Sequence, residues 1–177
     1  MLFRSDESAL LCVWTVVRPD AIVDVVAETL PAALQALPEM DLDTFNVIRI
    51  ERGIPLFLVD MNDDTIPLEA GIEDRAISFT KGCYVGQEII VRVTHRGGGR
   101  VARKLVKWVA DAGATAIPGA GAKIVSATRD VGRVTSAAYS PQLKRIVGLG
   151  YVHRDFADAA TPLEIASSDA SLKAVVA

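Results

Sequence analysis

From about residue 101 onward, short runs of β-branched and apolar residues alternate with glycine, proline and polar turns. This pattern constrains the fold most, because it is typical of all-β domains that form a small barrel or a sandwich. The pair Arg129-Asp130 lies between two such runs, which predicts a hairpin that turns at this pair. We expect strands over residues 101–109, 123–127, 132–138, 145–152, 162–166 and 172–176.

The first part of the chain mixes extended and helical patterns. Residues 10–17 are rich in β-branched and aromatic side chains and predict a buried strand. Pro19 suits the first turn of a helix, and the apolar residues between 22 and 37 follow helical spacing, so a helix is expected there. Pro38 would end it.

A second helix is expected next, with Asp41 or Asp43 as its cap and Gly53 as its stop. Beyond it we expect an extended segment over residues 54–61, a turn over 62–65, and an irregular or briefly helical segment over 67–78. The glycine run at 97–99 is the expected boundary between two domains, residues 1–98 and 99–177.

Composition excludes several classes of protein. The 177 residues are 50% hydrophobic and carry a net charge of -3, which is ordinary for a globular protein and argues against a general polyanion binder. Only two cysteines and two histidines are present, so no zinc site is expected. Two distant cysteines favour a reducing compartment, and we expect a cytoplasmic protein without a membrane span.

Residues 81–88, KGCYVGQE, are the best candidate for a functional loop. Most free cysteines are small buried hydrophobic residues, but Cys83 lies between Gly82 and Gly86, which permit a tight bend. Lys81 supplies a cation that can favour the thiolate. A reactive thiol, an acceptor of a one-carbon or sulfur species, and one ligand of a shared cluster are the functional interpretations. Tyr84, Gln87 and Glu88 would shape the pocket around it.

A basic segment follows the loop, with no acidic residue between Glu88 and Asp111. A solvated face is the ordinary explanation of such a run. On an acidic protein it also suggests an anionic ligand, namely a carboxylate tail, a phosphate or RNA, of which RNA is the weaker option because few aromatic residues are near. The basic residues are Arg92, His95, Arg96, Arg100, Arg103, Lys104 and Lys107.

Three carboxylates, Glu51, Asp60 and Glu69, lie in an otherwise apolar region. Most such acids are solvated, but a carboxylate can also accept two parallel hydrogen bonds from the ring N–H groups of a ligand.

These motifs together resemble the YgfZ-like branch of the folate-binding, glycine cleavage T-protein superfamily. Residues 45–55, residues 66–71 and the cysteine loop occur in the family's order, and the cysteine loop is the most specific match. Residues 132–136 and 149–152 resemble the family's C-terminal barrel. The resemblance covers nearly all of the chain from about Val13.

The resemblance implies an α+β fold, with an incomplete ferredoxin-like folate-binding α/β lobe followed by a small antiparallel β-barrel. It implies a tetrahydrofolate-type cofactor, with Glu51 reading the pterin and Arg103 near the folate. The remaining residues expected at this site are Tyr84, Gly82, Gly86, Gln87, Glu88 and Arg96. Full-length family members are about twice as long, so we expect an N-terminal lobe to be missing and exposed apolar surface to favour self-association.

Three functions are therefore expected, in this order. The first is a folate-linked accessory role in iron–sulfur cluster assembly or repair, with Cys83 as the reactive thiol, Lys81 beside it, and iron–sulfur proteins as partners. The second is an aminomethyltransferase that passes a one-carbon unit to tetrahydrofolate. The third is a module that contacts tRNA through the basic segment.

Overall fold

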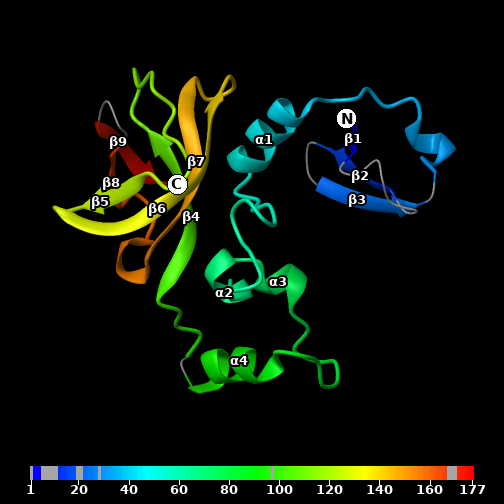
Figure 1. The fold of residues 1–177 in the computed structure, drawn as a ribbon, viewed down its shortest axis with the longest axis horizontal. Helices are drawn as coiled ribbons and strands as arrows, with labels where there is room; N and C mark the ends of the chain where they lie inside the picture. Colours follow the sequence, from blue (N-terminus) through cyan, green and yellow to red (C-terminus); the bar gives the residue numbers. More distant parts are fainter. Residues whose placement is uncertain (1, 5–11, 19–21, 28, 97, 167–170) are drawn as a thin grey trace. The chain divides into compact units, whose positions relative to one another are not determined.

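The computed structural model describes the chain except for residues 1, 5–11, 19–21, 28, 97 and 167–170. It divides into two compact units, residues 1–48 and 49–177, which are described separately (Figure 1). The predicted domain boundary after residue 98 stays a prediction, because a division by compactness does not locate the family's domain boundaries. Among the described residues, no helix is both long and apolar enough to cross a membrane.

The first unit contains a small antiparallel sheet in the order β1-β2-β3. Its strands are β1 (Leu2–Arg4), β2 (Cys12–Val17) and β3 (Ile22–Ala27), with Cys12 opposite Ala27 and Val17 opposite Ile22. The strand predicted at 10–17 is confirmed over Cys12–Val17, and its first two residues lie outside the described part. A 3₁₀ turn, η1 (Ala32–Leu34), follows.

The helix predicted between residues 22 and 37 is wrong, and Pro19 lies outside the described residues. β3 and η1 take its place. The sequence of β3 is IVDVVA, whose β-branched residues favour a strand when a partner strand is available. Strand pairing with β2, reinforced by a 2.7 Å hydrogen bond from the Thr15 hydroxyl to Asp24, therefore outweighed the helical spacing of the apolar residues.

Helix α1 (Leu42–Glu51) confirms the second predicted helix and crosses from one unit to the other. Asp41 is its cap and accepts the Thr44 N–H at 2.7 Å. Hydrogen bonds from the Thr44 side chain and from this N–H lower the pKa of the Asp41 carboxyl. The helix ends at Gly53, which has a φ of +68° and donates its N–H to the Ile50 carbonyl.

The segment after α1 is a series of turns and one-turn helices. Residues 54–61, expected to be extended, instead form a compact turn with a single bridge between Phe57 and Met61. The turn at 62–65 is confirmed. The segment 67–78, predicted to be irregular or briefly helical, contains the short helices α2 (Pro67–Ala70) and α3 (Glu73–Ala76). Helix α4 (Gln87–Val91), which was not predicted, runs on into the wider helical turn η2 (Arg92–Arg96).

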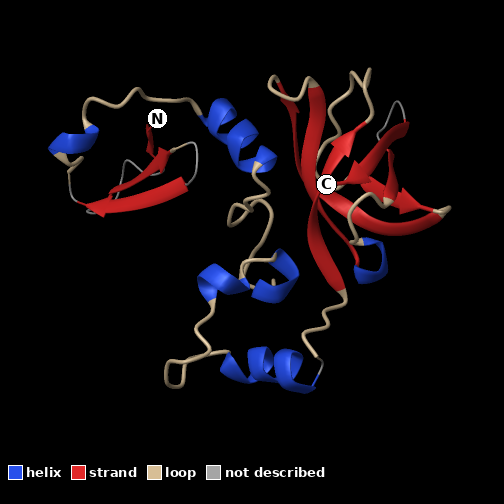
Figure 2. Cartoon of the chain, turned by 180° about the vertical axis from the view of Figure 1, so that it is seen from behind, coloured by secondary structure: helices blue, strands red, loops and turns tan. Residues whose placement is uncertain are grey.

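The remainder is a closed antiparallel barrel in the order β4-β7-β6-β5-β8-β9, with β4 also paired to β9 (Figure 2). This confirms the barrel rather than the sandwich. The short turn η3 (Arg154–Phe156) follows β7. The strands are β4 (Arg103–Ala110), β5 (Lys123–Ser126), β6 (Arg129–Ser140), β7 (Arg145–His153), β8 (Pro162–Ala166) and β9 (Ser171–Val176).

The barrel core is apolar, with Trp108, Ile124 and Ile165 fully buried. The predicted β5–β6 hairpin is present, but it turns at Ala127 and Thr128 instead of Arg129-Asp130. Both turn residues have positive φ, as a tight two-residue hairpin turn requires. Arg129 and Asp130 therefore begin β6, where Asp130 lies beside Arg133 and its pKa is lowered by that guanidinium.

Candidate functional site

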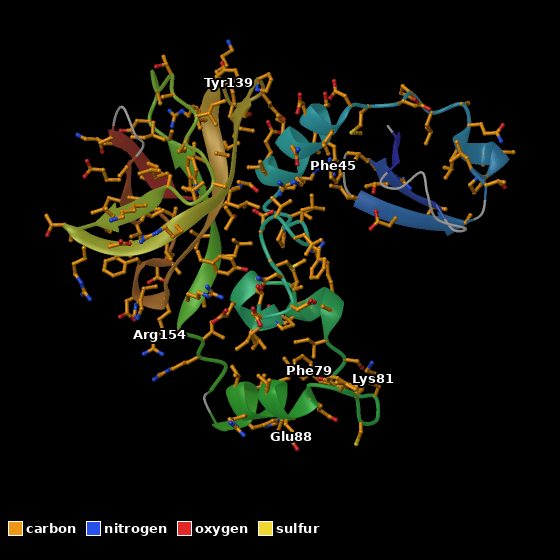
Figure 3. All side chains as sticks on the ribbon, in the orientation of Figure 1. Phe45, Phe79, Lys81, Glu88, Tyr139 and Arg154 are labelled. Atoms are coloured by element: carbon orange, nitrogen blue, oxygen red, sulfur yellow. The ribbon has the colours of Figure 1, made fainter. Side chains whose placement is uncertain are left out.

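The cysteine loop is exposed and leads directly into α4. Cys83 is a free, exposed thiol. Gly86, with a φ of +84°, forms the turn that begins α4, as the glycine pattern predicted. The Lys81 ammonium lies over the Tyr84 ring, 4.9 Å from its centre, so its described contact is with that ring. Figure 3 shows Lys81 on the loop and Glu88 on α4.

A pocket of about 540 Å³ lies beside this loop. Tyr84, Val85 and Gly86 line one side, and the turn that contains Asp63 and Asp64 lines another. Ligand pockets in proteins commonly have this size and this mixture of apolar walls with a few polar groups. Tyr84, Val85 and Gly86 thus form part of a cavity wall. Gln87, which is half-buried, and Glu88, which is exposed, are not among the lining residues.

Glu51 lies at the C-terminal end of α1 and is held against the barrel. Its carboxylate accepts a 2.5 Å hydrogen bond from the Ser140 hydroxyl, and Ser140 is fully buried at the end of β6. The Lys107 ammonium donates to the Glu51 carbonyl at 3.3 Å. The first contact fixes the position of a partly exposed carboxylate, and the second holds the backbone of the helix end.

A buried ion pair anchors the same helix end. Arg49 donates to Asp60 at 2.6 Å and to the Ser136 hydroxyl at 3.0 Å, and both charged side chains are almost fully buried. Thr135 and Ser136 each donate to Asp60 at 2.5 Å. Neighbouring residues of a strand normally face opposite ways, but a bulge between Val134 and Ser136 allows both hydroxyls to reach one carboxylate.

Asp60 therefore has a structural role that sequence reasoning missed. It was considered only as a solvated acid or a ligand-reading carboxylate, yet it also accepts the Leu56 N–H at 2.9 Å and so holds the turn at 54–61. The polar pair Thr135-Ser136 in the middle of β6 was the available signal, but nothing in the sequence indicates its distant partner.

Arg103 lies at the start of β4 among polar and aromatic groups. Its Nε donates to Glu69 at 2.9 Å, and its guanidinium lies over the Tyr151 ring, 4.8 Å from the centre. Asp60, Thr65, Arg103 and Tyr151 all line a hollow of about 210 Å³. Burial raises the pKa of the Tyr151 phenol, and the Arg103 charge partly offsets the effect.

The predicted site residues thus occupy three places in the second unit: the cysteine loop with its pocket, the Glu51 helix end, and the Arg103 hollow. Arg92, His95, Arg100 and Lys104 are exposed, and the Arg96 side chain lies outside the described residues. In the described part of the chain, no three His, Cys, Asp or Glu side chains gather as a metal site would require.

Exposed apolar side chains occur on the turn at 57–59 and around the cysteine loop. Leu58 is 77% exposed, and Phe79, Val85 and Ile89 are also exposed. Apolar surface of this kind was expected, but self-association through it stays a prediction.

The second unit is a small antiparallel β-barrel domain, preceded by short helices and by the end of α1 that carries Glu51. Residues 103–177 match the glycine cleavage T-protein C-terminal barrel domain. The chain belongs to the glycine cleavage T-protein, folate-binding superfamily, and corresponds to its C-terminal portion.

Curated relatives include the aminomethyltransferase of Thermosynechococcus vestitus, 30% identical over 92% of this chain and 42% of the relative. The aminomethyltransferase of Caldanaerobacter subterraneus subsp. tengcongensis is 29% identical over 74% of this chain and 33% of its own length. The chain therefore spans less than half of the length of these relatives. A crystal structure of glycine cleavage system aminomethyltransferase T from Bartonella henselae shares the fold, with a TM-score of 0.64 and 21% identity over 74% of this chain and 36% of that one.

Proposed function

We propose that this chain takes part in tetrahydrofolate-dependent one-carbon transfer of the aminomethyltransferase type. The observation that carries the proposal is Glu51, whose carboxylate is held by Ser140 and whose backbone carbonyl is held by Lys107. The relatives of this chain are named aminomethyltransferases. The comparisons thus favour this function over the accessory role ranked first from the sequence.

The residues present suit a folate. Glu51 offers a fixed acceptor for ring N–H groups, and the half-exposed Arg103 offers a cation for a carboxylate of the tail. Tetrahydrofolate, when bound, supplies the nitrogen atoms that take up a one-carbon unit. The task of these side chains is to bind and orient it.

Replacing Glu51 with glutamine is expected to weaken tetrahydrofolate binding by about tenfold or more, because a charged acceptor is exchanged for a neutral amide. Calorimetric titration of the chain with tetrahydrofolate measures this loss. Glu39→Gln, an exposed acid in the first unit, is the matched control and is expected to bind as the parent does. Equal affinity of the parent and Glu51→Gln, or no binding by the parent, would contradict the proposal.

A second function is favoured by the exposure of Cys83. An accessible thiol, in a glycine-flanked loop beside a pocket, supports a YgfZ-like accessory role in iron–sulfur cluster assembly or repair. In that role Cys83 would react with, or ligate, the group that is handed on, while Lys81 and Tyr84 shape its surroundings.

Changing Cys83 to alanine is expected to abolish complementation of a strain that lacks its own homologue, while leaving the thermal unfolding temperature unchanged, because the side chain is exposed. Thr80→Ala serves as the control, since Thr80 is an exposed residue just before the loop and is not among the residues that line the pocket. Complementation by the Cys83→Ala protein at the parental level would rule out the accessory role.

A further inference from the structure

A polar hollow of about 660 Å³ lies where the chain enters β4, outside the places assigned above. Arg100 and Lys104 line it from one side and Arg154 from the other. Figure 3 labels Arg154 beside the start of β4. Two neighbouring cations and a third that is distant in sequence therefore share one concave surface.

Strand pairing brings them together. β4 pairs with β7 so that Arg103 lies opposite His153, and the Arg154 N–H donates to the Ala102 carbonyl at 3.1 Å. Gly98 and Gly99 have φ values of +59° and +73°, and the Gly99 N–H donates to the Val93 carbonyl at 2.9 Å. This turn directs the chain from η2 into the strand and places Arg100 at the edge of the hollow.

The charges in the hollow favour an anion. Arg100 and Lys104 are exposed, and the acids among the described residues of the lining are Asp155 and Asp158. Asp155 lies 3.5 Å from Arg154 and 3.4 Å from His153, and an ion pair that is this long and exposed contributes little. Arg154 can therefore leave Asp155 for a stronger anionic ligand at small cost.

We propose that this hollow binds a phosphate group. Two guanidinium groups and an ammonium match the oxygens of a phosphate, and a guanidinium can donate two parallel hydrogen bonds to it. The phosphate belongs either to a small phosphate ester or to the backbone of a nucleic acid, and the two sources differ in how many contacts they make. The proposal does not depend on the folate or iron–sulfur functions.

The test compares three probes: inorganic phosphate, AMP and a short single-stranded RNA. Binding is followed by ³¹P NMR for the first two and by fluorescence anisotropy at several salt concentrations for the RNA. Saturable binding of phosphate and AMP identifies a small ester, and binding of the RNA alone, weakening steeply with salt, identifies a backbone phosphate. Failure of all three probes to bind overturns the proposal.

Matched variants separate the hollow from general surface charge. The double change Arg100→Ala and Lys104→Ala is expected to weaken binding of the active probe roughly tenfold or more. The control pair Lys123→Ala and Arg129→Ala removes two exposed charges from the β5–β6 hairpin and is expected to have no such effect. An equal loss in both pairs overturns the proposal.

A further variant is expected to strengthen binding, a result that loss of folded protein cannot produce. Asp158→Asn removes an acid from the lining and is expected to tighten binding several-fold, because less negative charge then opposes the phosphate. Unchanged or weaker binding by this variant counts against the proposal.

Discussion

Replacing Asp60 with alanine is expected to lower the free energy of unfolding of the second unit by about 3–5 kcal/mol. The change leaves Arg49 buried without its carboxylate partner. It also removes the acceptor for the Thr135 and Ser136 hydroxyls and for the Leu56 N–H. A typical domain has only about 5–15 kcal/mol of stability, so a large part of it would be lost.

Urea unfolding followed by tryptophan fluorescence measures the effect of Asp60→Ala. A Trp14→Phe background makes the signal specific to Trp108, which is fully buried in the barrel. Asp63→Ala, an exposed acid three residues away, is the control and is expected to change stability by less than about 0.5 kcal/mol. If Asp60→Ala were as mild as this control, the ion pair would not be the anchor of the Glu51 helix end.

Changing Gly148 to alanine is expected to destabilise the barrel by about 3 kcal/mol or more. A Cβ at this position would lie 2.1 Å from the Trp108 ring and 2.6 Å from the Ser136 carbonyl oxygen. Neither can move freely, because Trp108 is fully buried and Ser136 is paired to β7. Close packing around Gly148 therefore leaves no room for any side chain at this position.

The same Trp108 fluorescence measurement tests Gly148→Ala. Gly119→Ala is its matched control, because a Cβ there meets nothing within 4 Å and its φ is not in the left-handed region. The control is expected to be neutral or slightly stabilising, since alanine restricts the unfolded chain. A Gly148→Ala protein as stable as Gly119→Ala would show that Trp108 can repack.

Most structural features that depend on neighbouring residues were predicted correctly, whereas features that depend on distant residues were not. Helix α1 was predicted together with its stop Gly53 and with Asp41 or Asp43 as its cap, of which the structure uses Asp41, because capping depends on residues within one turn. The barrel strands were predicted because alternating apolar residues and turn residues are local signals. The segment that became β3 was predicted as a helix, because its apolar spacing fits either structure and only pairing with β2 decides between them.

In the candidate site, too, features set by neighbouring residues could be predicted and those set by distant residues could not. The cysteine loop could be recognised from its glycines and Lys81, since tight turns and a nearby cation are visible in a short segment. The pocket beside it depends on the turn at 63–67, which no local pattern connects to the loop. Likewise, the buried partner of Arg49 and the meeting of Arg154 with Arg100 and Lys104 depend on strand register and a bulge.

The sequence by itself therefore determined the ends of α1, the barrel strands and the position of the cysteine loop, because each follows from neighbouring residues. Only the tertiary structure decided which charged groups are buried and paired, and which remain available to a ligand. The physical reason is that the cost of burying a charge depends on partners supplied from distant parts of the chain. Asp60 receives such partners from β6, whereas Arg100 and Lys104 remain at the surface.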